Sequence, residues 1–246
     1  MVGVWQLAVT AGAIDRRFLP APTAVLSAIG QMMNEHILIV DISSTLLRVV
    51  VGFAIGACLG VVAGLSTGIF KTTREALEPV IQLARPIPAV ALVPLAITWF
   101  GVGEASKLFI ISWAAFFPSW VSTHTAAASV PKEFLWTAAL LGADRWRTIW
   151  GVIIPWSLKF VQTGARISMG LAFAATVVAE MSGANAGLGY RIEISHNGFR
   201  MDRMLADMLL LGLLGACLDW SYLRGVRSLI PWAFDTREGT PRKLDK

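Results

Sequence analysis

The sequence predicts an all-α fold, a polytopic bundle of membrane-spanning helices that forms one domain over residues 1–246. Composition is the first reason, because hydrophobic residues make up 55% of the chain and charged residues only 15%, against about 25% charged residues in soluble domains. A soluble fold of this length could not cover its surface with so few charges, whereas a bilayer accepts an apolar surface. The other two reasons are an uncharged run, Val49–Phe70, and a glycine repeat inside it.

Five stretches approach the length of about 20 apolar residues that a spanning helix needs. The start of the chain, Met1–Ile14, is apolar but too short to span alone, so we expect an incomplete or partly inserted first helix. The five predicted spans, in chain order, are Val49–Phe70, Pro86–Val102, Leu108–Thr123, Ile167–Ala186 and Met204–Leu223.

The second predicted span contains three prolines, Pro86, Pro88 and Pro94. Proline lacks a backbone N–H and interrupts helical hydrogen bonding, but neighbouring helices can compensate for this inside a membrane. We therefore expect a kinked helix whose freed backbone groups are available to a transport pathway.

The distribution of basic residues predicts the orientation. Most of the Lys and Arg side chains lie in the loops 71–79 and 129–163 and in the tail 224–246. Cytoplasmic loops of membrane proteins carry an excess of Lys and Arg, so these three segments are expected on the cytoplasmic side.

Glycine recurs every four residues through the first of these spans. This spacing keeps small residues on a slowly winding stripe of the helix, and such stripes let two membrane helices approach closely. The sequence therefore predicts tight packing of this helix at Gly52, Gly56, Gly60, Gly64 and Gly68. Channels, pumps and membrane enzymes all use such packing, so the stripe does not indicate a function.

Several other classes of site are not indicated. The basic residues are spread between apolar runs and form no basic stripe, which argues against a nucleic-acid partner; membrane lipid is the expected surrounding. Cys58 and Cys217 lie inside apolar runs, as small hydrophobic fillers do, and the three histidines lack metal-ligand spacing.

The loop 129–163 predicts a short helix, a glycine turn and a second short helix. A helix from Lys132 can end at Gly142, since glycine favours the C-terminal cap. Asp144 can cap a second helix that Pro155 ends or kinks. Small residues surface the bend, namely Ala138, Ala139, Gly142 and Ala143. Close docking into a groove of another protein and an ordinary interfacial loop both remain open on these grounds.

The segment Trp136-Thr-Ala-Ala-Leu-Leu-Gly142, with Pro155 thirteen residues after the glycine, resembles the EAA motif of binding-protein-dependent ABC importer permeases. Ala138, Gly142 and Pro155 stand at motif positions. Trp136 replaces the motif glutamate and Thr137 its first alanine, so the contact made by that acid in the family has no direct counterpart here.

Further stretches match, in order, the nitrate, sulfonate, taurine and bicarbonate-type branch of these permeases, from about residue 19 to 232. They are Leu19-Pro-Ala-Pro22, Glu78-Pro79, Arg85-Pro-Ile-Pro-Ala-Val-Ala-Leu-Val-Pro94, Trp99-Phe-Gly-Val-Gly-Glu104, Ala179-Glu180 and Gly187-Leu-Gly-Tyr190.

The resemblance implies a type I importer permease in a bacterial inner membrane, working as a dimer of two copies. It implies two cytoplasmic ATPase subunits and an external substrate-binding protein as partners. The loop would be the coupling helix that docks on the ATPase, through Ala138, Ala139, Gly142, Ala143, Asp144 and Pro155. ATP and Mg²⁺ would bind to the partner, so this chain is expected to be neither an enzyme nor a cofactor-binding protein.

Ionisable residues inside a membrane are expensive and are therefore functional candidates. We expect a small anion to pass along the third and fifth helices of this six-helix permease, near Arg85, Pro86, Pro88, Arg166 and Glu180. Interface anchoring of the two arginines and a structural ion pair of Glu180 are the alternatives. A self-sufficient channel or secondary transporter is the rival function, although no internal repeat supports it.

Overall fold

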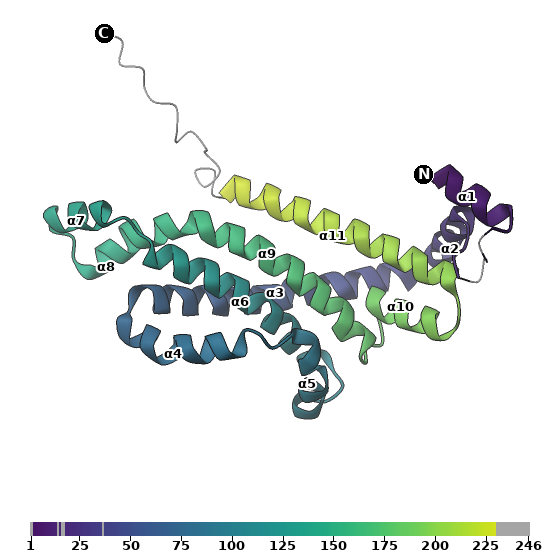
Figure 1. Ribbon diagram of the computed structural model, residues 1–246, viewed down its shortest axis with the longest axis horizontal. Helices are drawn as coiled ribbons and strands as arrows, with labels where there is room; N and C mark the ends of the chain where they lie inside the picture. Colours follow the sequence, from purple (N-terminus) through teal and green to yellow (C-terminus); the bar gives the residue numbers. More distant parts are fainter. Residues whose placement is uncertain (1, 14, 16–17, 36, 230–246) are drawn as a thin grey trace, which may run out of the picture.

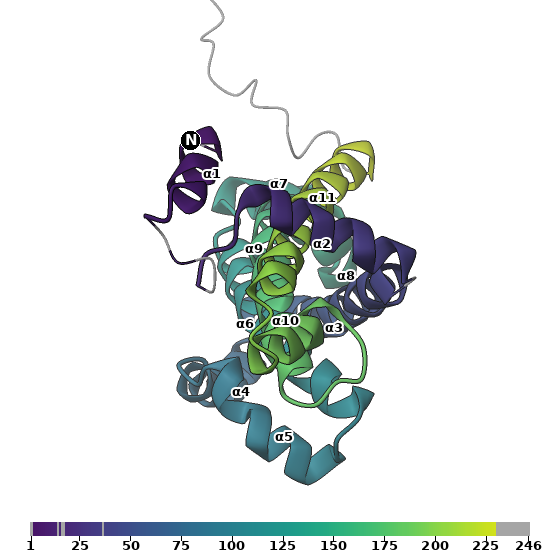
Figure 2. The ribbon, with the colours of Figure 1, turned by 90° about the vertical axis from the view of Figure 1, so that its right-hand side faces the viewer.

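The computed structural model describes residues 2–13, 15, 18–35 and 37–229, and every regular element in them is helical. Long helices run side by side along the long axis of the molecule (Figure 1), and the view along that axis shows them gathered into one bundle (Figure 2). The elements are α1 (Val2–Thr10), α2 (Pro22–Asn34), α3 (Ile37–Ile69), α4 (Lys71–Ala84), η1 (Ala89–Leu92), α5 (Val93–Phe100), α6 (Glu104–Ala128), α7 (Lys132–Leu140), α8 (Arg145–Thr148), η2 (Ile149–Ile153), α9 (Ile154–Met181), α10 (Leu188–Asn197) and α11 (Met201–Leu229).

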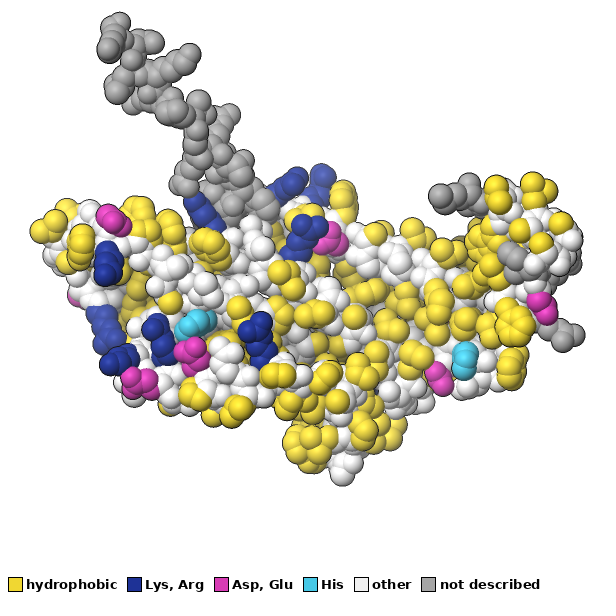
Figure 3. Space-filling model, in the orientation of Figure 1, with side chains coloured by type: hydrophobic (Ala, Val, Ile, Leu, Met, Phe, Trp, Pro, Cys, Tyr) yellow, Lys and Arg dark blue, Asp and Glu magenta, His cyan; other side chains and the backbone are white. Residues whose placement is uncertain are grey.

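Two ends of the bundle can be distinguished. α7 and α8 lie at one end, which we call the inner end, and α2 and α10 lie at the other, the outer end (Figure 1). On the face shown in Figure 3, charged side chains gather near the inner end and beside the C-terminal end of α11, while the middle of the bundle is largely hydrophobic. This distribution fits a bundle that crosses a bilayer lengthwise.

Three helical stretches combine the length and the hydropathy that a membrane crossing requires, namely Ile37–Ile69, Arg145–Met181 and Met201–Ser228. A fourth crossing is obtained if the bent pair Lys71–Ala84 and Ala89–Phe100 counts as one span. α6, with 25 residues, packs between α3 and α9. The prediction of five spans is thus confirmed only in part.

The second of the five predicted spans, Pro86–Val102, is wrong as a single kinked helix. The predicted loop 71–79 is instead the start of α4, and the axis turns by 88° before η1 and α5. Pro86 and Pro88 explain the break, because each removes a backbone donor and disfavours helical geometry in the preceding residue.

The boundaries of the other spans also differ from the predicted ones. α3 begins at Ile37 and not at Val49. The predicted start was late because the first turns of α3 contain buried polar side chains, which interrupt the apolar pattern. The predicted loop 129–163 includes the first ten residues of α9, and α9 ends at Met181 and not at Ala186. The predicted tail from 224 begins as the end of α11, while residues 230–246 lie outside the described residues.

The glycine stripe of α3 lies against α6. A methyl group added to Gly56 would lie 2.3 Å from the carbonyl oxygen of Ser112, and one added to Gly60 would lie 2.5 Å from that of Phe116. At Gly52, Gly64 and Gly68 an added methyl group would lie 2.5 to 2.6 Å from side-chain carbons of Ile111, Thr123 and Ala127. Only a residue without a side chain permits this approach of the two backbones.

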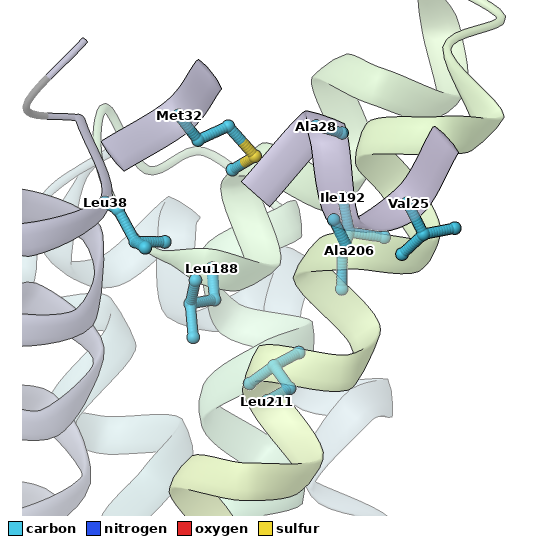
Figure 4. Close-up of a cluster of buried hydrophobic side chains, with 8 residues drawn as sticks. All are labelled: Val25, Ala28, Met32, Leu38, Leu188, Ile192, Ala206 and Leu211. Atoms are coloured by element: carbon cyan, nitrogen blue, oxygen red, sulfur yellow. The ribbon is translucent and has the colours of Figure 1, made fainter. Parts of the chain in front are cut away.

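A separate apolar cluster holds the outer end together. It joins α2, α3, α10 and α11 (Figure 4), and it positions α10 across the end of the bundle. Its members are Val25, Ala28, Met32, Leu38, Leu188, Ile192, Ala206 and Leu211.

Candidate functional site

A cavity of about 620 Å³ lies beside the helix break and is bounded by η1, α6 and α9. Its wall is mostly apolar, with aromatic side chains from α6 such as Trp113 and Phe117 and aliphatic ones from α9 such as Leu171. Arg85 brings the one cationic side chain among its lining residues, and Pro88 lines it as well. Apolar walls with a few polar groups are typical of small-molecule sites.

The break lies deep along the bundle and not at its end. The indole Nε1 of Trp113, in the third turn of α6, donates a hydrogen bond to the carbonyl oxygen of Ile87 at 3.2 Å. Irregular backbone at membrane depth is tolerated where it is buried in protein or lines a water-filled cavity. The segment 85–88 is exposed and lines the cavity through Arg85, Ile87 and Pro88.

Arg85 is exposed and forms no ion pair with any residue that the structure describes. Pro86 is exposed next to it, although it does not line the cavity itself. An unpaired guanidinium at the mouth of an apolar cavity is well placed to meet a carboxylate, sulfonate or similar oxyanion.

Arg166 is placed differently. Its guanidinium donates two hydrogen bonds of 2.7 Å to the carboxylate of Asp219 and thereby joins α9 to α11. Its neighbour Ile167 lines the cavity, but Arg166 is committed to this pair. The sequence did not indicate Asp219 as its partner.

Glu180 is fully buried and surrounded by donors. Its carboxylate accepts hydrogen bonds from Thr45 Oγ1, from the guanidinium of Arg48 at 2.8 Å and from the backbone N–H of Gly189 at 2.9 Å. The arrangement therefore favours the structural ion pair that remained open for Glu180, because no face of the carboxylate is left for a solute.

Arg48 is the centre of this network and was missed from the sequence. Beyond Glu180 it donates to Glu104, at the start of α6, at 2.7 and 2.8 Å and to the carbonyl oxygen of Ala186 at 2.6 Å. It thus joins α3, α6, α9 and the turn that leads to α10. Asp41, Thr45 and Arg48 recur at helical spacing ahead of the apolar run, and this pattern could have revealed them.

The turn between α9 and α10 is held by α3. The carboxylate of Asp41 accepts from the backbone N–H of Gly187 at 2.8 Å and pairs with Arg191 of α10. Gly187 has a φ of 126°, and a side chain there would also collide with the Glu180 carboxylate. A glycine is required on both counts.

At the inner end, the helix–turn–helix expected between Lys132 and Pro155 is formed. Gly142 adopts a φ of 74°, and the backbone N–H of Ala143 bonds to the carbonyl oxygen of Ala138 at 2.9 Å. The Asp144 carboxylate caps α8 by accepting from the N–H of Arg147 at 2.8 Å. These bonds fix the angle at which α7 and α8 meet.

Of the two outcomes expected at Pro155, an end or a kink of the second helix, the helix does not end there. The π-helical segment η2 precedes it, and the helix continues from Arg145 to Met181. A wider turn accommodates the missing N–H of the proline, as π-type insertions do in other helices. The bend is therefore linked rigidly to α9.

The same end exposes a group of large hydrophobic side chains, which we call the inner patch. The side chain of Leu140 is 87% exposed and that of Trp136 is 63% exposed. A concentration of exposed apolar side chains on this scale marks an interaction site. The inner patch comprises Phe134, Trp136, Leu140, Leu141, Trp146 and Trp150.

A comparison with family models identifies residues 56–229, more than half of the chain, as a binding-protein-dependent transport system inner membrane component. The chain belongs to this family.

Several named permeases are similar in sequence to this chain over most of its length. The taurine transport system permease protein TauC of Escherichia coli K12 is 31% identical and covers 94% of this chain and 86% of its own length. The putative aliphatic sulfonates transport permease protein SsuC of Bacillus subtilis 168 is 30% identical, covering 94% and 84%. The nitrate import permease protein NrtB of Synechocystis is 28% identical, covering 88% and 81%.

Among solved structures, an inward-facing MetNI methionine ABC transporter matches the fold of the permease with a TM-score of 0.69 at 18% identity. The match covers 81% of this chain and 98% of the other. The likeness supports the helical arrangement and carries no information about the solute.

The protein is accordingly a permease subunit of an ABC importer in the inner membrane, and the ATPase is a separate subunit. The family works with an ATPase and a binding protein as partners. A self-sufficient channel or secondary transporter is not supported by this membership.

Proposed function

We propose that this permease conducts a small anion through the cavity beside the helix break, and that Arg85 meets the anion there. The observation that carries the proposal is the unpaired, exposed guanidinium of Arg85 at a broken helix, next to a cavity of about 620 Å³. A broken helix at membrane depth is the usual location of a transported solute.

The relatives support an anion as the solute. Their names refer to taurine, aliphatic sulfonates and nitrate. Each of these solutes has a sulfonate or nitrate group, in which several oxygens share a negative charge, and an arginine can bind two such oxygens through paired N–H donors. Bicarbonate belongs to the same chemical class. Pro86 and Pro88 contribute by keeping the segment 85–88 out of a helix.

Coupling to ATP hydrolysis is proposed to run through the inner patch and the bend at Ala138, Ala139, Gly142, Ala143, Asp144 and Pro155. In the proposed assembly two identical copies of the permease bind two ATPase subunits, which hold ATP and Mg²⁺, and an external binding protein delivers the anion. Because the helix is continuous from Arg145 to Met181, a movement of α8 on the ATPase would be transmitted to the wall of the cavity in α9.

The test is uptake by the assembled importer in proteoliposomes, with taurine, an alkanesulfonate and nitrate as separate probes. We expect Arg85→Ala to lower uptake of the transported probe at least tenfold, Arg85→Lys to retain part of it, and ATPase activity without solute to stay within twofold. Lys71→Ala is the control, since it removes an exposed cation from the other end of α4. Unchanged uptake by Arg85→Ala would refute the role of Arg85.

A further inference from the structure

A second, smaller cavity of about 130 Å³ lies at the outer end, among α2, α10 and α11, and takes no part in the proposed path. It adjoins the apolar cluster of Figure 4, because Met32 of α2 belongs to that cluster and also lines the cavity. The lining residues are Met32, Ile37, Arg191, Ile194, Ser195, Gly198, Arg200, Arg203 and Asp207.

The cavity contains polar atoms that lack hydrogen-bond partners. Asp207 has an exposure of 0%, and neither of its carboxylate oxygens is bonded to any described residue. The Nε of Arg203, one helical turn earlier, is buried and equally unpartnered. A buried carboxylate without donors is strongly unfavourable, so these atoms require a partner that the described part of the chain does not supply.

The charges around the cavity restrict what that partner can be. Three guanidinium groups face it, which disfavours a metal ion or another cation. Two of them are already paired, Arg191 with Asp41 and Arg203 with Glu35. An anion in the cavity would be repelled by the negative charge of the Asp207 carboxylate. The partner must therefore be uncharged, and it must donate to Asp207 and accept from Arg203.

We propose that this cavity is a hydration site in which ordered water molecules donate to the carboxylate of Asp207 and accept from the Nε of Arg203. A cavity of about 130 Å³ has room for several waters, since one water occupies about 30 Å³ in the liquid and makes about three hydrogen bonds in such sites.

The waters complete a row of alternating charges across the outer end. The row runs from Glu35, directly after α2, through Arg203 and Asp207 of α11 and Arg191 of α10 to Asp41 of α3. Direct ion pairs close the two ends of this row, and the waters join its middle. The row holds α10 against the bundle, on the same side as the Gly187 turn.

Radiolytic hydroxyl labelling of the whole importer in nanodiscs tests the proposal, because radicals formed from a bound water oxidise the side chains beside it. Met32 lines the cavity and is 2% exposed, whereas Met204 of α11 lies at the same end, is more exposed and does not line the cavity. Labelling by bulk solvent alone would oxidise Met204 at least as fast. We expect Met32 to be oxidised several-fold faster than Met204.

A variant that removes the need for water gives the second arm. Asp207→Leu replaces the carboxylate with an apolar side chain, so the waters lose their acceptor and the Met32 rate should fall to that of Met204 or below. Equal oxidation of Met32 and Met204 in the unaltered protein would overturn the proposal, and this comparison does not depend on whether the variant folds.

Discussion

Arg48 shows how one side chain can determine the arrangement of three helices. It reaches Glu104 on α6, Glu180 on α9 and the Ala186 carbonyl oxygen in a single guanidinium plane. Each of these acceptors is supplied by a different part of the chain, so their convergence depends on the helices being assembled. Arg48 thus differs from Arg85, whose guanidinium forms no ion pair with any of the described residues.

Removing Arg48 should destabilise the permease markedly. Arg48→Leu leaves the buried Glu180 carboxylate without its cation, and breaking a buried pair in this way costs about 3–5 kcal/mol. Thermal unfolding of the purified permease measures the loss. Adding Glu180→Gln should recover part of it, because the uncompensated charge is then gone; a double variant no more stable than Arg48→Leu would contradict this account of the pair.

At the scale of elements, the contact between α3 and α6 depends on backbone proximity. The neighbour of Gly56 is a carbonyl oxygen of α6, which cannot rotate away as a side-chain tip can. The apolar faces of both helices are as stable against lipid tails as against each other, so the van der Waals contacts of close packing must supply the attraction between the helices.

Gly56→Ala is therefore expected to destabilise the permease by about 1–3 kcal/mol, the usual cost of overpacking. Gly170→Ala is the matched control: Gly170 lies within α9 and has no atom within 4 Å of its would-be Cβ. That change should be neutral or stabilising by up to about 1 kcal/mol, as alanine is the better helix former. Equal effects of the two changes on thermal unfolding would show that the stripe is not a packing surface.

The inner patch includes one residue, Trp136, that differs from the EAA motif which the loop otherwise resembles. Trp136 stands where the EAA motif has glutamate, and its side chain is exposed on α7. A tryptophan in an interface buries a large apolar area and is among the residues that most often dominate binding energy. We therefore expect the ATPase partner to offer an apolar recess at this point.

Trp136→Ala should weaken binding of the ATPase subunit by about 2 kcal/mol or more, or roughly thirtyfold in the dissociation constant. Titration of the ATPase onto the permease in nanodiscs measures this. Leu209→Ala, which trims an exposed apolar residue of α11 away from the patch, is the control. A dissociation constant unchanged by Trp136→Ala would place the contact elsewhere.

The sequence predicted those parts of the fold that depend on local chemistry. The Asp144 cap, the glycine turn at Gly142 and the apolar middle of α3 all follow from residue type and spacing. The 88° break before η1 did not, because three prolines specify an interruption but not its angle. The spacing of Asp41, Thr45 and Arg48 marks a polar stripe on α3, but the partners of Arg48 were out of reach, since Glu104 and Glu180 are far apart in the chain and meet only through packing.

On the scale of the whole molecule, the two ends of the bundle differ in their chemistry. The outer end is closed by the buried Arg48 and Asp41 networks, while the inner end exposes the hydrophobic inner patch. α3, α6 and α9 run between them (Figure 1), and α6 and α9 line the cavity that Arg85 also lines. A change at the patch therefore has a continuous helical connection to the cavity.

If the cavity is a water-filled path and not a gap filled by lipid, its wall must be reachable by a charged reagent. Ala174 lies on the cavity wall in α9 and is exposed, so Ala174→Cys adds a thiol with little change in size. The native Cys58 and Cys217 are also exposed, but they lie within α3 and α11 and do not line the cavity. In the unaltered permease they serve as controls.

An anionic methanethiosulfonate reacts with thiolates, which form only in water. We expect it to modify Ala174→Cys, in a chain whose native cysteines are replaced by alanine, at least tenfold faster than it modifies Cys58 or Cys217 in the unaltered permease. A high concentration of the transported anion should slow the reaction, because both compete for the space beside Arg85. Equal rates at all three thiols would show that the cavity is continuous with lipid, and the path would then have to lie elsewhere in the bundle.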